Sequence, residues 1–368
     1  MELAQEEFIT VDTEFMREKT YYPQLCLIQA AGKHSAAIID PLAPGINLDA
    51  FYKVLANPAV LKVFHACRQD MEIFYHAMGT LPTPVFDSQI AAMVCGYGES
   101  ASYETLVGKI LGIAIDKSSR FTDWSHRPLT DKQLAYALDD VLHLRGIYSA
   151  LASRLLETGR KDWIKEEMEP VSHPETYENN PDEAWKKLRL RNASPRYLAY
   201  VQAAGRWREL TARDRNVPRS RIMKDETLAE VAQAKPENFA ALQKIRGFHP
   251  TMSATHYDPL FHTLQQVQSL PTSAYPQLPP RPSFLPGNEA LVDLLRLLLK
   301  ACAGENQVVP RLIADKDELE LLANGKRNHI KALHGWRHAI FGEKALRLLE
   351  GKIALKADGN SGIAFIEA

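Results

Sequence analysis

Apolar residues recur along the first half of the chain in two alternating patterns. Short runs rich in β-branched and other apolar residues are typical of strands, and they cover 8–15, 22–31, 34–42 and 60–66. Helical spacing of apolar residues predicts helices over 48–58, 69–79, 89–98, 102–112 and 130–157. Three strands in hairpin-like order, followed by mixed strands and helices, predict an α/β domain over residues 1–165 with a mixed central sheet flanked by helices.

Beyond about residue 183 the pattern changes to helical segments broken by Pro and Gly, and only the last residues resemble a strand. Six prolines in 269–288 argue against a helix and predict an extended linker over 271–287. On either side of it, "VPRSRIMKDETLAEVA" (217–232) matches "VPRLIADKDELELLA" (309–323), and "IRGF" (245–248) matches "LHGW" (333–336). Two matches in the same order indicate a duplication. We therefore expect a connecting segment and two all-α helical-bundle domains, over 166–192, 193–270 and 288–368.

The net charge of −1 conceals an uneven distribution. Residues 1–170 carry 16 Lys and Arg against 23 Asp and Glu, whereas residues 171–368 carry 28 against 22. Within 183–224 there are 12 basic residues against 3 acidic ones, interleaved with Trp and Tyr. Arginines beside aromatic side chains can bind phosphates and stack on bases, so this region is predicted to contact RNA. The alternative is that the aromatic side chains form the core and the arginines a solvated surface.

Several kinds of protein are disfavoured. The chain has no apolar run long enough to cross a membrane, and Glu2, Glu6 and Glu7 stand where a signal peptide would be basic. Its four cysteines are scattered without zinc spacing, which is typical of reduced thiols in a cytoplasmic protein. "GYGESA" (96–101) fits a dinucleotide-binding pattern, but a helix rather than a strand is predicted before it. No GxxxxGK[ST] motif occurs, so we expect no nucleotide cofactor.

Two carboxylates lie close together at the end of the first predicted strand. Asp12 and Glu14 are two residues apart, so on a strand their side chains project from the same face. Two like charges held this close repel each other unless a cation lies between them, and oxygen ligands suit Mg²⁺ or Mn²⁺. The alternative is a solvated strand end, or pairing with Arg17 or Lys19.

Three further candidates follow later in the chain. Asp70 begins the helix after the strand over 60–66, where ligands gather in open α/β sheets, although the helix dipole alone also favours a carboxylate there. Tyr136 and Asp140 are four residues apart on a helix and share one face, so the phenol could orient a water molecule or accept its proton. The alternative is that Tyr136 packs in the core and Asp140 pairs with a surface base.

Together these residues form the order D-x-E … D … Y-x-x-x-D, which resembles the tyrosine-containing branch of the DEDD 3′→5′ exonucleases. The surrounding segments are similar to the ribonuclease D family, almost continuously over 7–165: "DTEFMREKTYYPQLCLIQ", "FHACRQDMEIF", "FDSQIAA" and "DKSSRFTDWSHRPLTDKQLAYALDDV". The repeated helical segments resemble the helicase-and-RNase-D C-terminal (HRDC) domain, present twice. One departure is that the chain begins only a few residues before the first motif, where the family has a further strand and helix; we expect this to loosen the sheet edge without affecting the site.

The resemblance implies a ribonuclease H-like domain that removes nucleotides hydrolytically from RNA 3′ ends, releasing nucleoside 5′-monophosphates with two divalent metal ions, Mg²⁺ or Mn²⁺. It implies that Asp12 bridges both ions and that Glu14 and Asp140 complete the site of the ion that holds the attacking water. It further implies that Asp70 serves the second ion through water and that Tyr136 positions the nucleophile. The implied substrate is RNA with a free 3′ end, such as a tRNA precursor, and we expect a cytoplasmic monomer.

Residues adjoining the motifs are candidates for contact with the terminal nucleotide, and each also has a purely structural explanation: Phe15, Gln24, His65, Trp124 and Arg127. Two other functions stay open. The same carboxylates would serve a DNA exonuclease, because the chemistry ignores the 2′-hydroxyl and contacts to that group decide the choice. A catalytically silent RNA-binding protein could keep the fold, although all five of the site residues are present here.

Overall fold

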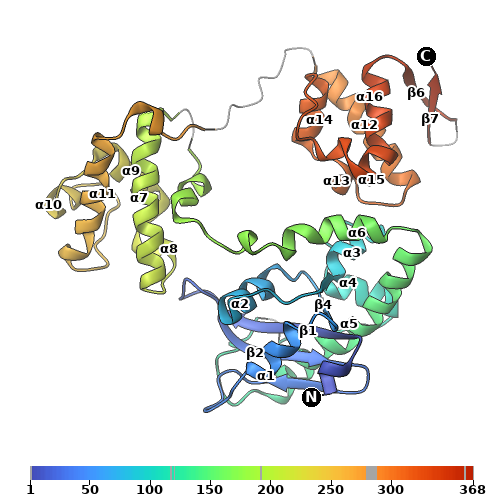
Figure 1. The fold of residues 1–368 in the computed structure, drawn as a ribbon, viewed down its shortest axis with the longest axis horizontal. Helices are drawn as coiled ribbons and strands as arrows, with labels where there is room; N and C mark the ends of the chain where they lie inside the picture. The colour runs from blue at the N-terminus through green and yellow to red at the C-terminus, as the bar shows by residue number, and fades with distance from the viewer. Residues whose placement is uncertain are drawn as a thin grey trace.

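The computed structural model describes residues 2–116, 118–119, 121–190, 193–278, 288–359 and 362–367. Its N-terminal part is built on a five-stranded sheet in the order β3-β2-β1-β4-β5 (Figure 1). The strands are β1 (Phe8–Met16), β2 (Gln24–Ala31), β3 (Ala36–Ile39), β4 (Leu61–Phe64) and β5 (Val85–Asp87). β1, β2 and β3 pair antiparallel, whereas β1, β4 and β5 pair parallel, which confirms a mixed sheet.

Helices cover both faces of this sheet. They are α1 (Asp49–Leu55), α2 (Arg68–Met78), α3 (Ser88–Val94), α4 (Tyr103–Leu106), α5 (Asp131–Glu157) and α6 (Lys161–Met168). The long α5 begins at a capping box in which Thr130 and Gln133 each accept a hydrogen bond from the other's backbone N–H, which agrees with the helix predicted from residue 130. α2 ends at Gly79, whose positive φ closes the helix.

The alternation of side chains along β1 decides which residues meet which helices. Ile9 is fully buried in a cluster with apolar side chains of α1 and α2. Thr10 projects from the opposite face, where its hydroxyl donates to the backbone carbonyl of Val141 in α5 at 2.8 Å. Asp12 and Glu14 follow Thr10 at two-residue steps, so they share the face that α5 covers.

The second half consists of two helical units followed by a hairpin of β6 (Ile353–Ala357) and β7 (Ile363–Glu367). The first unit contains α7 (Pro195–Asp214), α8 (Arg219–Ile222), α9 (Asp225–Ala234), α10 (Phe239–Leu242) and α11 (Asp258–Gln268). The second contains α12 (Glu289–Glu305), α13 (Pro310–Ile313), α14 (Lys316–Ala323), α15 (Gly335–Arg337) and α16 (Glu343–Leu349). Both begin with a long helix, a short helix and a third helix, and the matching glycines Gly247 and Gly335 both have positive φ. These shared features support the duplication.

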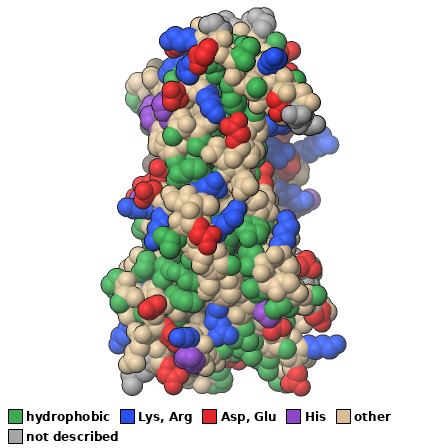
Figure 2. Space-filling view, turned by 90° about the vertical axis from the view of Figure 1, so that its right-hand side faces the viewer, with side chains coloured by type: hydrophobic (Ala, Val, Ile, Leu, Met, Phe, Trp, Pro, Cys, Tyr) green, Lys and Arg blue, Asp and Glu red, His purple; other side chains and the backbone are tan. Residues whose placement is uncertain are grey.

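Both helical units contact the N-terminal part, and each contact has charged and aromatic components. In the second unit, Trp336 stacks on Trp163 of α6 with ring centroids 4.2 Å apart, and Arg337 pairs with Glu166 and Glu167. On the face shared by the second unit and the N-terminal part, basic and acidic side chains are interspersed (Figure 2). The uneven charge of the two halves therefore does not divide this face into two regions of opposite charge.

Two parts of the fold differ from the sequence-based expectation or lie beyond it. The three-residue strand β5 was not predicted, because it is too short to display an alternating pattern. Most of the predicted linker, 279–287, lies outside the described residues. The domain boundaries stay predictions, and we note that residue 165 lies within α6.

Candidate active site

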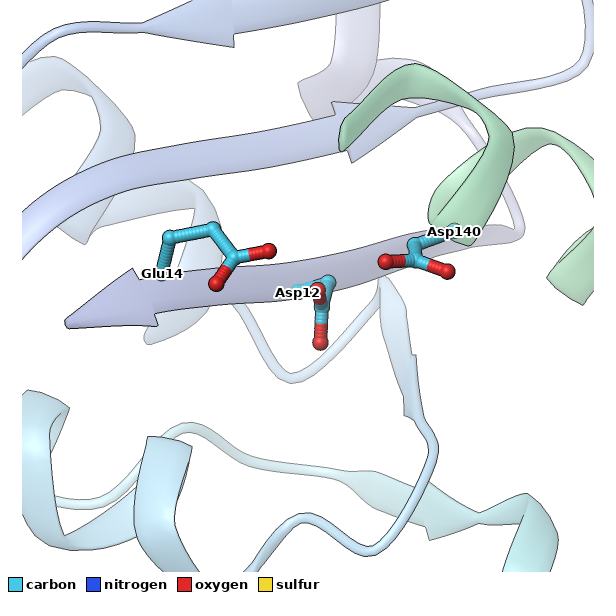
Figure 3. Close-up of side chains that lie close together, drawn as sticks. All are labelled: Asp12, Glu14 and Asp140. Carbon is cyan, nitrogen blue, oxygen red and sulfur yellow. The ribbon is translucent and has the colours of Figure 1, made fainter. Parts of the chain in front are cut away.

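Three carboxylates from two elements come together on the α5 face of the sheet. Asp12 and Glu14 extend from β1 and Asp140 extends from α5, and all three side chains point into one region (Figure 3). Each residue contributes one carboxylate oxygen to a group of three oxygens that all lie within 4.8 Å of one another. Asp139, one residue away on α5, is exposed. Three oxygens at this spacing can share a divalent cation, because Mg²⁺ and Mn²⁺ prefer oxygen ligands.

The fourth carboxylate, Asp70, approaches β1 from the other face of the sheet. β4 pairs with β1 only over Phe8–Thr10, so beyond Thr10 the edge of β1 on that side has no strand beside it. There Asp70, in the first turn of α2, accepts a short hydrogen bond from the Thr13 hydroxyl. Asp70 is outside the group of three that lie within 4.8 Å, but it lines the same cavity.

A turn held by Asp87 determines where Asp70 lies. The carboxylate of Asp87 accepts the backbone N–H groups of Ala66 and Cys67 at 3.0 and 2.8 Å, and it also caps α3. Ala66 has a φ of 57°, a conformation that residues other than glycine rarely adopt. The turn between β4 and α2 is thus stabilised from a separate strand, and it sets the start of the helix that carries Asp70.

Burial leaves Asp12 and Asp70 poorly solvated, which disfavours their charged forms. Burial, and after it the neighbouring charge of Asp70, raise the pKa of Asp12 well above its usual range. Burial also raises the pKa of Asp70 to about 7, against the opposing effect of the hydrogen bond from Thr13. Both shifts mean that the negative charges are unfavourable without a nearby cation. The donor set therefore fits divalent metal ions, which would compensate these charges.

Tyr136 adjoins the cluster as its spacing from Asp140 predicts. Burial, and then the carboxylates of Asp140, Glu14 and Asp12, raise the pKa of the phenol above its usual range, and the phenol hydrogen-bonds Asp140. A phenol in this setting keeps its proton and donates it in a hydrogen bond. Both roles that the sequence leaves open for Tyr136, orienting a water molecule and accepting a proton from it, stay predictions.

The carboxylates and Tyr136 line a cavity of about 1020 Å³. Of the candidate nucleotide contacts, Phe15, His65 and Trp124 line it as well. Gln24 and Arg127 do not belong to its described lining. Gln24 is exposed at the start of β2, and the Arg127 guanidinium is engaged by Asp40, at 2.6 and 2.7 Å, and by backbone carbonyls.

Two residues at the site escaped the sequence reasoning. Thr13 was not among the candidates, yet its hydroxyl hydrogen-bonds the Asp70 carboxylate. Tyr103 of α4 lines the cavity, and its hydroxyl donates to the backbone carbonyls of Asp139 and Asp140 at 2.9 and 2.6 Å. Nothing in the local pattern distinguishes Tyr103 from a packing tyrosine, because its partner lies 37 residues away.

Comparison with known proteins agrees with this architecture. A family described as 3′-5′ exonuclease matches residues 1–156, and one described as the HRDC domain matches residues 198–262. The crystal structure of Escherichia coli RNase D, described as an exoribonuclease involved in structured RNA processing, superposes with a TM-score of 0.80 at 29% identity. That match covers 95% of this chain and 94% of the other.

Bacterial relatives match over nearly the whole chain. The ribonuclease D of Acidiphilium cryptum is 44% identical over 358 residues, which cover 97% of this chain and 91% of the relative. The ribonuclease D of Jannaschia sp. is 45% identical over 361 residues, which cover 97% and 93% respectively. A likeness this high and this extensive includes the exonuclease part and both helical units. The chain therefore belongs to the ribonuclease D family and is a hydrolase, a 3′→5′ exoribonuclease.

Proposed function

We propose that this exoribonuclease acts through two divalent metal ions, Mg²⁺ or Mn²⁺, held by Asp12, Glu14, Asp70 and Asp140. The observation that carries the proposal is the grouping of three carboxylate oxygens within 4.8 Å at the wall of a large cavity. Asp70, on the other side of β1, supports a second position, because its charge is close enough to raise the pKa of Asp12. Asp12 lies between these two groups and is the residue suited to both ions.

When bound, such ions lower the pKa of the attacking water and stabilise charge on the leaving 3′-oxygen. The residues of the chain have complementary tasks. Thr13 orients the Asp70 carboxylate by its hydrogen bond, and the neutral Tyr136 phenol, beside Asp140, is placed to hold a water molecule. Phe15 and Trp124 provide apolar and aromatic walls where the terminal nucleotide would lie, and His65 is positioned by Ser88 at 2.9 Å.

The direct test is the shortening of a single-stranded RNA by the full chain with Mg²⁺, followed by identification of the product. We expect nucleoside 5′-monophosphates released from a free 3′ end, and no release when that end carries a 3′-phosphate. The matched control is Asp12→Asn, which keeps the size of the side chain but loses its charge. Equal rates for wild type and Asp12→Asn would exclude the proposed ligand set.

A matched DNA strand tests the second candidate, a DNA exonuclease with the same site. The carboxylates do not distinguish the sugars, so discrimination has to come from contacts to the 2′-hydroxyl. We expect RNA to be shortened faster. Faster removal of deoxynucleotides would show that the catalytic site is correct but the substrate assignment is not.

We further propose that the natural substrate is RNA with a 3′ extension, of the tRNA-precursor kind, and that the chain works as a cytoplasmic monomer. The role in structured RNA processing stated for the Escherichia coli protein supports this substrate.

The four cysteines are free and buried, as expected of a reducing compartment. In the described part of the chain, no helix is long and apolar enough to cross a membrane. Size-exclusion chromatography with light scattering tests the monomer.

A further inference from the structure

A second cavity lies where the exonuclease part meets the first helical unit. It has a volume of about 410 Å³, within the usual range for small-molecule pockets. Its walls come from four separate segments: the loop after β1, the end of α2, the chain before α7, and α7 itself. The lining residues are Tyr21, Tyr22, Tyr75, His76, Glu178, Asn179, Asn180, Pro181 and Arg213.

The pocket is unusually aromatic. The rings of Tyr22 and His76 meet edge to face with centroids 4.6 Å apart, and the rings of Tyr75 and His76 lie 5.7 Å apart. Tyr22 and Tyr75 are half-buried and His76 is exposed, so these rings do not belong to a closed core. Rings that stay accessible beside a cation are the features on which bases of single-stranded nucleic acids stack.

A network of hydrogen bonds holds the pocket together across the boundary. Asn216, which follows α7, accepts the backbone N–H groups of both Tyr21 and Tyr22 at 3.1 Å. The Tyr21 hydroxyl donates to the buried Glu209, and the Arg213 guanidinium donates to that hydroxyl at 3.1 Å. The first helical unit thus fixes the loop that carries Tyr22, and it places the charge of Arg213 in the pocket wall.

The pocket and the catalytic cavity share two elements. The cavity is lined by Lys19 and Gln69, whereas the pocket is lined by Tyr22 on the same loop and Tyr75 on the same helix. Tyr22 follows Lys19 by three residue steps, a span of at most roughly 11 Å. Tyr75 follows Gln69 by six steps on the helix, which is about 9 Å along the axis. A nucleic-acid strand with its 3′ end in the cavity can therefore reach the pocket within a few nucleotides.

The loop and α2 are also joined between the two sites. Arg17 and Glu72 form a bidentate ion pair with distances of 2.7 and 2.8 Å. This pair joins the loop that carries Lys19 and Tyr22 to the helix that carries Gln69 and Tyr75.

We propose that this pocket binds an unpaired base of the RNA substrate upstream of its 3′-terminal nucleotide, with Tyr22 as the stacking surface and Arg213 facing the backbone. The proposal rests on the proposed function, because it takes the 3′ end to lie at the carboxylates. It assigns the first helical unit a definite task, which is to complete a base-binding site that neither part has alone. The side-chain oxygens of Asn179 and Asn180 accept from Lys187 and from the backbone N–H of Asp182, so their NH₂ groups are the atoms that can donate to the edge of the base.

The test uses the full chain with Asp12→Asn to prevent turnover, and a single-stranded RNA of about ten nucleotides. The fluorescent base 2-aminopurine is placed in turn at each position near the 3′ end. We expect one internal position at which stacking quenches the fluorescence. Adding Tyr22→Leu should restore that fluorescence and weaken binding roughly 5-fold or more. Tyr22→Trp, which keeps an aromatic ring, should retain the quenching and the affinity of the parent chain. Tyr52→Leu, which alters a half-buried tyrosine on α1, is the matched control and should change neither.

Activity gives a second readout in the chain with Asp12 intact. The loss of kcat/KM caused by Tyr22→Leu should be at least about 5-fold greater for the long strand than for a dinucleotide too short to reach the pocket. Equal losses of kcat/KM on both substrates would contradict the proposal that this pocket binds a base. The same holds if no position has fluorescence that depends on Tyr22. A wild-type chain that quenches the probe but never shortens RNA would overturn the proposed function and leave the pocket supported.

Discussion

At the residue scale, the site is defined by charges that are costly to bury. Asp12 extends from β1 and Asp70 from the first turn of α2, and both have raised pKa values because burial and neighbouring acids disfavour their ionised forms. Natural proteins place such unfavourable charges where function requires them. The surrounding hydrogen bonds, from Thr13 to Asp70 and between Tyr136 and Asp140, orient these groups without removing their charge.

Metal ions should stabilise the folded chain, because they bind the folded cluster and not the unfolded chain. In differential scanning calorimetry we expect Mg²⁺ at about a hundred times its Kd to add ~2.7 kcal/mol to the free energy of unfolding. In Asp12→Asn this gain should shrink strongly. With a chelator present, the melting temperature of Asp12→Asn should equal or exceed that of wild type, since one buried charge is gone. A variant that melts clearly lower under those conditions would indicate that Asp12 is a structural residue.

Removing the hydroxyl of Tyr136 should affect the chemical step more than substrate binding. Tyr136→Phe keeps the ring against Trp124, 6.1 Å away between centroids, but loses the donor beside Asp140. We expect kcat to fall about 10- to 100-fold with KM changed less than about 3-fold, consistent with the loss of an interaction that orients the nucleophile. Steady-state kinetics on a short RNA measure this. Parallel losses in kcat and affinity would instead indicate a packing role.

At the element scale, the start of α2 depends on a turn that its own sequence does not stabilise. Ala66 adopts a positive φ, and the N-terminus of α2 has no side-chain cap on Cys67. Asp87 supplies the missing acceptor from the end of β5, 20 residues further along the chain. The strand that sequence reasoning missed therefore positions Asp70, one of the four carboxylates proposed to hold the metal ions.

Asp87→Ala should destabilise the exonuclease part and displace Asp70. The variant leaves the N–H groups of Ala66 and Cys67 without their acceptor and removes the N-cap of α3, so we expect a loss of about 2–4 kcal/mol in the free energy of unfolding. Chemical denaturation measures the loss. Asp49→Ala, at an exposed position on α1, is the matched control and should cost less than about 0.5 kcal/mol. A loss at Asp87 no larger than this control would mean that the turn is stable without it.

At the scale of the whole molecule, two buried charged groups join the helical units to the exonuclease part. Glu209 binds Tyr21, Arg213 and Arg219, and Arg337 binds Glu166 and Glu167 beside the stacked tryptophans. If the partners of either buried group were removed, a charge would stay buried without compensation, which would destabilise the fold. The ion pairs and hydrogen bonds of Glu209 and Arg337 therefore favour one arrangement of the helical units against the exonuclease part.

The Glu209 contact should give the stability of the chain a defined pH dependence. Burial opposes ionisation, but hydrogen bonds from Arg219 and Tyr21 hold the pKa of Glu209 below its usual range. Because the folded pKa is the lower one, this carboxylate stabilises the fold above about pH 4.3 and the contribution disappears as the pH falls through the folded value. Glu209→Gln should therefore unfold about 3 kcal/mol more easily at pH 7, with the difference from wild type shrinking below about pH 4. A difference that stays constant from pH 7 to pH 3 would contradict this.

The sequence by itself determined the elements and the residue types of the site, because both are encoded over short distances. Period-two alternation located β1, and it put Asp12 and Glu14 on one face. The four-residue spacing of Tyr136 and Asp140 placed them on one side of α5, and Thr130 marked where that helix begins. The D-x-E … D … Y-x-x-x-D order identified the family before any distance was known.

Only the tertiary structure decided which distant residues meet, because packing between faces is not visible in local periodicity. It placed Asp140 within 4.8 Å of the β1 carboxylates but set Asp70 on the far side of the strand. It engaged Arg127 with Asp40 rather than at the cavity wall. It also brought Tyr22 against Asn216, 194 residues away, and so created a pocket from segments that carry no shared sequence signal.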